Sequence, residues 1–118
     1  MKMKSIAGIN CYVKDLNKTA NFYETLGFEI KKREANHITI YLNWFWIDFL
    51  AIDIEDKPEF LKKANLSDKG AGLVLYISVD NVDDFYNNLV SKGFKPKSEP
   101  RNWPWGNREF VIRDPDGY

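Results

Sequence analysis

Aromatic and acidic side chains are the residues of this chain that could do chemistry, because histidine and cysteine are scarce. The 118 residues include four tryptophans, six tyrosines and eight phenylalanines, but one histidine, His37, and one cysteine, Cys11. A lone histidine without partner ligands is expected at a solvent-exposed strand start, and Cys11 as an inert buried residue. No nucleophile is paired with a base in the manner of a catalytic site. The composition therefore favours binding over catalysis.

The tryptophans lie in two short stretches. In YLNWFWIDF, Trp44, Trp46 and Asp48 alternate, and in WPWGNRE, Trp103 and Trp105 flank a proline in an expected loop. Large aromatic faces on a rigid framework bind flat, partly apolar molecules by stacking, and they accept cations over their rings. A carboxylate beside them could hold a positively charged or amide-bearing group by a charge-assisted hydrogen bond.

The elements that must position these residues begin with a strand and a helix. Residues 9–13 alternate between apolar and polar types, as a strand does. A helix capped at Asp15 or Asn17 should follow and end at Gly27, where a left-handed residue is common. Three further strands are expected, beginning at Phe28, over 38–43 and over 45–54.

The second half of the chain repeats this pattern. Val79, Gly93 and Phe94 follow Val13, Gly27 and Phe28 at one constant offset, which indicates an internal duplication. A strand should end at Val79, a helix should bury one apolar face, and a strand should cover 108–114 before the turn DPDG. The apolar helix face comprises Val82, Phe85, Tyr86, Leu89 and Val90. We expect a single domain, 1–118, with module one at about 5–54, a linker at about 55–72 with one helical turn at 59–64, and module two at about 73–118.

Two segments resemble a known family. VKDLNKTANFYETLGFEI and WPWGNREFVIRDPDGY resemble the glyoxalase/bleomycin resistance protein/dioxygenase (vicinal oxygen chelate) family, and the second is closest to its bleomycin-resistance-like branch. The resemblance implies an α+β fold, in which two tandem βαβββ modules form a curved mixed sheet around a cleft, often in a homodimer. The last strand of module two would follow Tyr118. We expect a disordered or deleted tail to carry it, the alternative being a strand supplied by a partner.

The resemblance also bears on metal chemistry. Metal-dependent members of the family place a histidine at the start of the first strand of each module, and these positions are Gly8 and Val74 here. Neither side chain has a donor atom, whereas divalent metals need several N, O or S ligands. The resemblance therefore implies no metal, no other cofactor and no catalytic residue. A metal-dependent lyase or extradiol dioxygenase is the alternative, with a carboxylate ligand beyond Tyr118.

Strand alternation divides the expected core from the expected cleft. The core-facing residues are Ile9, Cys11, Val13, Ile38, Ile40, Leu42, Phe45, Ile47, Phe49, Ala51, Leu75, Ile77, Val79, Phe110 and Ile112. The predicted ligand-binding residues are Tyr12, Tyr41, Trp44, Trp46, Asp48, Tyr76, Trp103, Trp105, Glu109 and Arg113. In the resembled branch, the tryptophan that matches Trp105 helps to stack on the planar tail of a glycopeptide drug.

Each of these residues also has a structural interpretation. The tryptophans could pack in the core, in a loop or at a dimer interface. Asp48 could be held by a salt bridge to Arg113 or Arg108, and Arg108 could pair with Glu109 across strands.

Charge and hydropathy exclude other classes of partner. Seventeen basic and seventeen acidic residues cancel, which argues against nucleic acid. No apolar run reaches the ~18 residues that a membrane helix needs. The apolar stretch at the start of the chain is too short for a signal peptide. We expect a cytoplasmic homodimer. It would bind a small aromatic molecule, neutral or cationic, without a metal and sequester it as bleomycin-resistance proteins do. A non-catalytic protein-interaction module is a second alternative.

Overall fold

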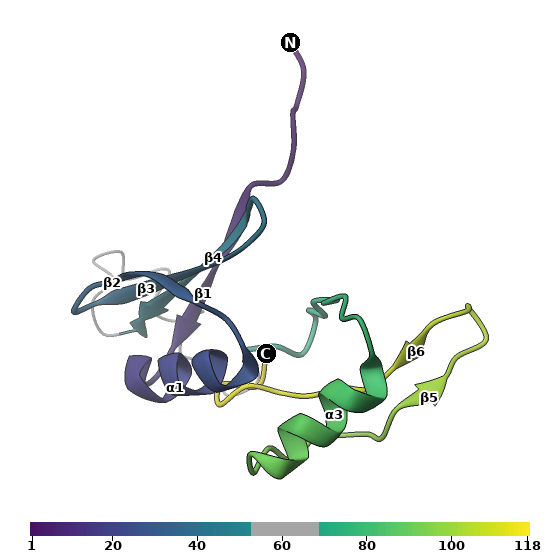
Figure 1. Ribbon diagram of the computed structural model, residues 1–118. Coiled ribbons are helices and arrows are strands. Elements are labelled where there is room, and N and C mark those ends of the chain that lie inside the picture. Colours follow the sequence, from purple (N-terminus) through teal and green to yellow (C-terminus); the bar gives the residue numbers. More distant parts are fainter. Residues whose placement is uncertain (53–68) are drawn as a thin grey trace. The chain divides into compact units, whose positions relative to one another are not determined.

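The computed structural model describes residues 1–52 and 69–118, which belong to two compact units, 1–69 and 70–118 (Figure 1). The boundary between the units falls within the linker predicted at about 55–72. The helical turn predicted at 59–64 and the end of the strand predicted over 45–54 lie outside the described residues. Each unit is described below by itself.

Over residues 1–52, the first unit is a mixed, four-stranded sheet with one helix against it. Its strands are arranged in the order β1-β4-β3-β2, in which β1 and β4 are parallel and the other neighbours are antiparallel. The elements are β1 (Gly8–Val13), α1 (Leu16–Leu26), β2 (Ile30–Arg33), β3 (His37–Leu42) and β4 (Phe45–Ala51). The predicted α+β class is confirmed.

Helix α1 begins and ends where the sequence predicts. The Asp15 carboxylate accepts hydrogen bonds from the backbone N–H groups of Asn17 and Lys18 at 3.0 and 3.1 Å, so Asp15 is the N-cap. Gly27 ends the helix with a φ of 121°, a conformation that strains any residue with a Cβ. Tyr23 packs on Phe49 with ring centroids 4.6 Å apart, which fixes the face of the sheet that α1 covers.

The core of the first unit lies between α1 and this covered face. Cys11, Val13, Ile38, Ile40, Ile47 and Phe49 are buried, as the alternation predicts. The prediction for Leu42 is wrong, since its side chain is 50% exposed, and Ile9, Phe45 and Ala51 are half-buried rather than core residues. Leu42 is the last residue of β3, and the chain turns immediately after it at Asn43, whose φ is 57°. His37 starts β3 as expected, but it is half-buried beside Glu34, whose Oε2 lies 3.6 Å from its Nδ1.

The second unit has one helix and a short hairpin. Its elements are α3 (Val82–Ser91), β5 (Arg101–Asn102) and β6 (Arg108–Glu109), and β5 pairs with β6 in antiparallel fashion. The Asn81 side chain caps α3 by accepting a hydrogen bond from the backbone N–H of Asp84 at 3.0 Å. Phe110 packs its ring on Tyr86 and Phe85, with centroids 5.3 and 6.4 Å apart. The segment after β6 is thereby attached to α3.

The predicted DPDG turn is present at the end of the chain. Gly117 has a φ of 94° and donates its N–H to the carbonyl of Asp114 at 3.0 Å. The buried Asp114 carboxylate also accepts from the N–H groups of Asp116 and Tyr118 at 2.9 and 3.0 Å. Short-range hydrogen bonding therefore determines this turn, as its residue types predict.

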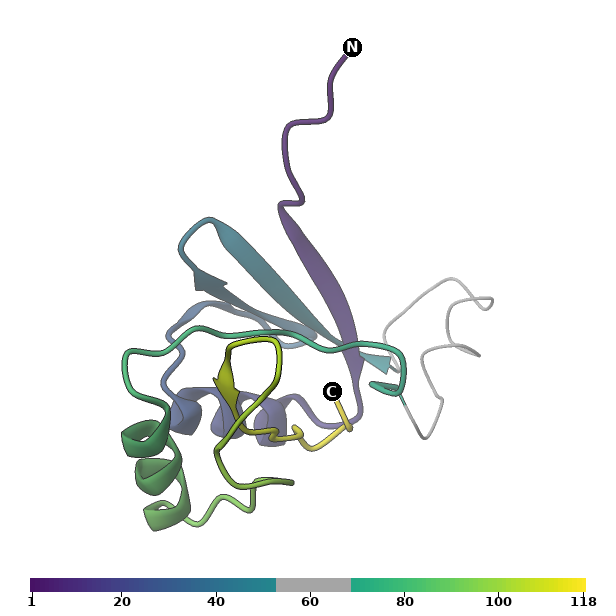
Figure 2. The same cartoon turned by 90° about the vertical axis from the view of Figure 1, so that its right-hand side faces the viewer.

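The second unit, whose last strand was expected after Tyr118, also has less strand structure in the described residues than the repeated pattern predicts. The run 73–79 is not a strand in the structure, and Figure 2 shows it as a plain tube rather than an arrow. Ile77, expected in the core, is 46% exposed. Leu75 is also exposed, Val79 is half-buried, and the strand predicted over 108–114 is reduced to β6. A strand needs a neighbour for its backbone groups, and no described segment pairs with 73–79.

The apolar faces of this unit are also less covered than predicted. Of the predicted face of α3, only Leu89 is buried, whereas Val90 is exposed and the others are half-buried. Phe110 and Ile112 are half-buried rather than core residues. Within the described segments, no helix is long and apolar enough to cross a membrane.

Candidate functional site

The face of the first sheet opposite α1 contains a row of aromatic side chains. Trp46 of β4 lies between Gly8 of β1 and Tyr41 of β3, its two register partners. Residues paired in register point to the same face of a sheet. Tyr41 is exposed, and Trp44, in the turn before β4, is 72% exposed. Tyr41 and Trp46 form an aromatic surface in the first unit, on the face that the alternation predicts, whereas the place of Trp44 on that face stays a prediction.

The next row of the same face contains the acid predicted to bind a ligand. Asp48 lies between Asn10 of β1 and Thr39 of β3, and the Thr39 hydroxyl donates a hydrogen bond to its carboxylate. Thr39 is buried and Asp48 is half-buried. This hydroxyl, rather than Arg113 or Arg108, is the partner that the structure records for Asp48. Tyr12, one row further along opposite Leu50, is half-buried.

The two positions that would bear histidines in a metal-dependent relative do not fit a metal. A Cβ added to Gly8 would overlap the indole ring and the carbonyl oxygen of Trp46, so Trp46 already fills the space that a ligand side chain would need. Val74 is exposed and offers no donor atom. Across residues 1–52 and 69–118, no three His, Cys, Asp or Glu side chains gather as a metal-binding group. Metal independence itself stays a prediction.

In the second unit the hairpin contains a three-layer stack. The Trp103 and Trp105 rings are stacked with centroids 4.7 Å apart and planes inclined by 11°. The guanidinium carbon of Arg101 lies 3.3 Å from the Trp103 ring centroid. Two groups this close cannot share one face, so Arg101 and Trp105 cover opposite faces of Trp103. Trp105 remains 60% exposed and presents its outer face. Of the two tryptophans predicted to contact a ligand from this loop, only Trp105 therefore has an open ring face.

A tight turn and one carboxylate fix the orientation of Trp105. The turn is closed by hydrogen bonds from Gly106 N–H to the Trp103 carbonyl at 3.0 Å and from Trp103 N–H to the Asn107 carbonyl at 2.8 Å. Glu109 Oε1 accepts the indole N–H of Trp105 at 3.2 Å and the side-chain amide of Asn107 at 3.3 Å. Glu109, predicted to face a ligand, thus also orients the aromatic ring beside it.

An ion pair that the sequence analysis missed joins this hairpin to α3. Arg108 donates from Nε and Nη2 to the two carboxylate oxygens of Asp83, both at 2.8 Å, and from Nη1 to Asn102 Oδ1 at 3.3 Å. Hydrogen bonding from Arg108 lowers the pKa of Asp83, and the carboxylate in turn raises the pKa of Arg108. The sequence suggests the adjacent Glu109 as the partner of Arg108. Asp83 lies 25 positions away, and nothing in the local sequence links it to Arg108.

The remaining predicted residues, Tyr76 and Arg113, lie outside both groups. Tyr76 is exposed in the run 73–79. Arg113 donates from Nη1 to the carbonyl of Gly117 at 2.9 Å and so supports the terminal turn. The structure therefore brings together Tyr41, Trp46 and Asp48 of β3 and β4 in one unit, and Trp103, Trp105 and Glu109 in the other.

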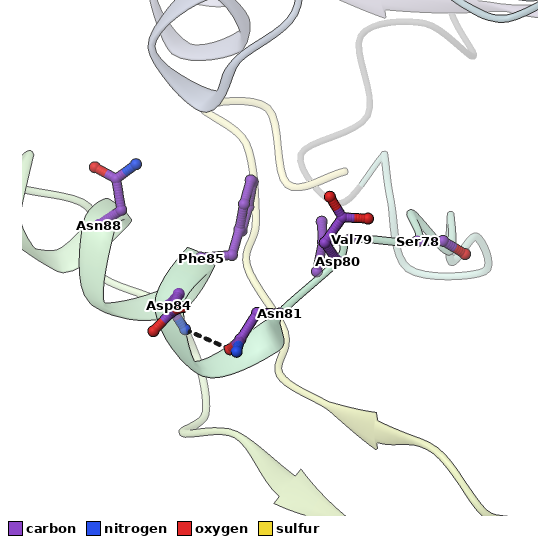
Figure 3. Close-up of a pocket in the computed structure, with 7 residues that line it drawn as sticks. All are labelled: Ser78, Val79, Asp80, Asn81, Asp84, Phe85 and Asn88. Atoms are coloured by element: carbon purple, nitrogen blue, oxygen red, sulfur yellow. Dashed lines mark hydrogen bonds between the residues drawn. The ribbon is translucent and has the colours of Figure 1, made fainter.

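The start of α3 is also hollowed. An open depression of about 540 Å³ is lined there by Ser78, Val79, Asp80, Asn81, Asp84, Phe85 and Asn88. Figure 3 shows the Asn81 side chain hydrogen-bonded to the backbone of Asp84 at the start of α3. Its acids and amides are those of a capped helix start, and none was a predicted site residue.

Fold and sequence together define the class. An α+β chain with a curved, unclosed mixed sheet and few helices has the fold of glyoxalase and bleomycin-resistance proteins. The chain belongs to the Glyoxalase/Bleomycin resistance protein/Dioxygenase superfamily, whose family model matches residues 5–118.

Solved structures similar to this chain cover nearly all of it. An integron cassette protein from V. cholerae is 27% identical, with a TM-score of 0.73, covering 99% of this chain and 91% of its own. A bleomycin resistance determinant encoded on transposon Tn5 is 25% identical, with a TM-score of 0.68 and coverage of 97% and 92%. A bleomycin-binding protein complexed with bleomycin, at 24% identity, TM-score 0.62 and the same coverages, shares the fold. No protein with a curated description matches the chain.

Proposed function

We propose that this protein binds a small, flat aromatic molecule, neutral or cationic, and sequesters it without a metal ion and without altering it. The observation that carries the proposal is the outer face of Trp105, which is exposed although the ring is held by a stack on one side and by Glu109 at its edge. Membership of the superfamily and the similarity to the transposon-encoded bleomycin resistance determinant support the same function.

The geometry of the stack favours binding for two reasons. A ring already held in place loses little conformational freedom when a ligand is added, so more of the contact energy appears as affinity. Each stacked pair contributes about 0.5–1.5 kcal/mol beyond the burial of apolar area. Trp105 can therefore act as a preformed platform, and a planar ligand would form the next layer.

The charge beside Trp105 bears on the kind of ligand. Glu109 accepts the indole N–H, so a negative charge lies at the edge of the ring whose face is open. A cation over an indole face is attracted by the ring quadrupole, and a nearby carboxylate adds to that attraction. We therefore infer a preference for planar cations over planar anions of equal size.

The aromatic surface of the first unit offers the same combination of groups. Trp46 and Asp48 alternate on β4 and face the side opposite α1. We propose that they form a second ligand surface, with Tyr41 beside Trp46 and with Tyr12 one row beyond Asp48. We further propose that the protein is cytoplasmic and a homodimer. The exposed apolar run 73–77 supports the homodimer, which light scattering on the intact chain would test.

Tryptophan fluorescence tests this function directly. Metal-free bleomycin, N-methylquinolinium and naphthalene-1-sulfonate serve as probes, the last two being planar ions of similar size and opposite charge. We expect saturable quenching by bleomycin and by the cation, weaker quenching by the anion, and unchanged titrations after treatment with a chelator. Absence of saturable quenching by all three probes, or loss of binding on chelation, would overturn the proposal.

A further inference from the structure

The hairpin that bears Trp103 and Trp105 has little to hold it in place by itself. Its two strands, β5 and β6, comprise two residues each, paired as Arg101 with Glu109 and Asn102 with Arg108. An isolated two-stranded hairpin is marginally stable in water even when it is longer. Contacts with another element must therefore contribute to its position.

Arg108 supplies such a contact and reaches both sides of the hairpin. Two of its donors hold the carboxylate of Asp83 in the first turn of α3, and a third holds the Asn102 side chain on β5. Asp83 lies in the first turn of a capped helix, whose N-terminus favours its negative charge. The fork of a guanidinium fits both oxygens of a carboxylate, which the ammonium of lysine cannot do.

Arg108 also immediately precedes the residue that orients Trp105. Glu109 follows it on β6 and accepts the Trp105 indole N–H, so a shift of β6 would move the carboxylate that fixes the ring. We propose that Asp83 and Arg108 form a clamp that positions the Trp103–Trp105 stack on α3 and thereby keeps the Trp105 face ready for a ligand. Asp83 and Arg108 are positioning residues, and only the effect on ligand affinity rests on the proposed function.

The clamp can be tested without a ligand. Closely stacked indoles couple their electronic transitions and give a pair of bands of opposite sign in far-UV circular dichroism. Trp105→Phe removes this couplet and defines its size. Asp83→Asn and Arg108→Lys should each lose most of it, and the exchange Asp83→Arg with Arg108→Asp should regain part of it. Both single variants should remain folded, because the Phe110 contacts with Tyr86 and Phe85 are untouched.

A matched control comes from the first unit. Glu24 and Arg33 form another exposed ion pair, at 3.4 Å, and Glu24→Gln should leave the couplet at its wild-type size. In titrations with N-methylquinolinium, Asp83→Asn and Arg108→Lys should bind about two- to fivefold more weakly, the range expected for loss of an exposed ion pair, whereas Glu24→Gln should bind as the wild type does.

The outcomes separate this proposal from the proposed function. Folded Asp83→Asn and Arg108→Lys variants that both keep the full couplet would overturn the clamp, whether or not the wild type binds probes. A wild-type spectrum identical to that of Trp105→Phe would overturn the stack and the clamp together. A couplet that depends on Asp83 and Arg108, in a protein that binds none of the probes, would support the clamp and refute the proposed ligand-binding function.

Discussion

Trp46 of β4 covers Gly8 of β1, its register partner in the parallel pair, so closely that a Cβ on Gly8 would overlap the indole. The family relationship makes this contact informative, because metal-dependent members place a histidine at the position of Gly8. The Trp46 indole fits against Gly8 because glycine has no side chain. An aromatic surface therefore occupies the space that one ligand of a metal centre would need.

Replacing Gly8 should destabilise the protein. Gly8→Ala and Gly8→His force the Trp46 ring or the backbone to move, and overpacking of this kind costs about 1–3 kcal/mol. Urea unfolding should show a lower midpoint for both variants. Adding Trp46→Ala to Gly8→Ala should give a smaller loss than the two single changes predict together. Strict additivity would mean that the two side chains do not compete for one space.

Removing the Trp105 ring should weaken ligand binding. Trp105→Ala removes the open platform of the stack and should weaken N-methylquinolinium binding about two- to tenfold, as the loss of one stacked pair implies. Its melting temperature should change little, because the ring is 60% exposed. Val90→Ala, which removes an exposed apolar side chain from α3 in the same unit, is the matched control and should bind as the wild type does. An affinity unchanged in Trp105→Ala would remove Trp105 from the site.

Arg101 should protect one face of Trp103. Arg101→Gln removes the guanidinium that lies 3.3 Å from the ring centroid, and collisional quenching of tryptophan fluorescence by acrylamide should increase. An exposed cation–π contact contributes about 0.5–1 kcal/mol, so the variant should remain folded. The same change made in a Trp103→Phe background should leave acrylamide quenching unaltered. Equal quenching of the wild type and Arg101→Gln would contradict the stacking order.

Acid should disrupt the clamp only at low pH. The pKa of Asp83 lies below its ordinary value of 3.8, chiefly because Arg108 donates hydrogen bonds to the carboxylate. A carboxyl group whose pKa is depressed by folding stabilises the structure above its unfolded pKa, and this contribution is lost as pH falls through the folded value. Arg108 stays protonated throughout, and the third group at the clamp, Asn102, does not titrate.

The tryptophan couplet should therefore be constant from neutral pH down to about pH 5 and should fall below pH 3.8. Circular dichroism across this range measures it, with the helix band of the same spectrum as the control for global unfolding. Asp83→Asn should show no such step. A couplet that falls well above the ordinary pKa of aspartate would show that another group controls the stack.

The amino-acid sequence determined the features that depend on near neighbours. Asp15 and Gly27 delimit α1 because capping and left-handed geometry act within a few residues. Alternation correctly separated the buried Ile38 and Ile40 from Tyr41, and the residue types of the terminal DPDG segment defined its turn. Family membership also followed from local motifs.

Tertiary structure decided which distant groups meet. Arg108 has Glu109 beside it in sequence but binds Asp83, because the helix start and not the adjacent strand residue presents both carboxylate oxygens to its fork. The run 73–79 alternates as a strand does but pairs with no described segment, since a strand depends on a partner that its own residues cannot supply. Side-chain periodicity records which residues avoid water, whereas pairing and stacking depend on where the rest of the chain places the second group.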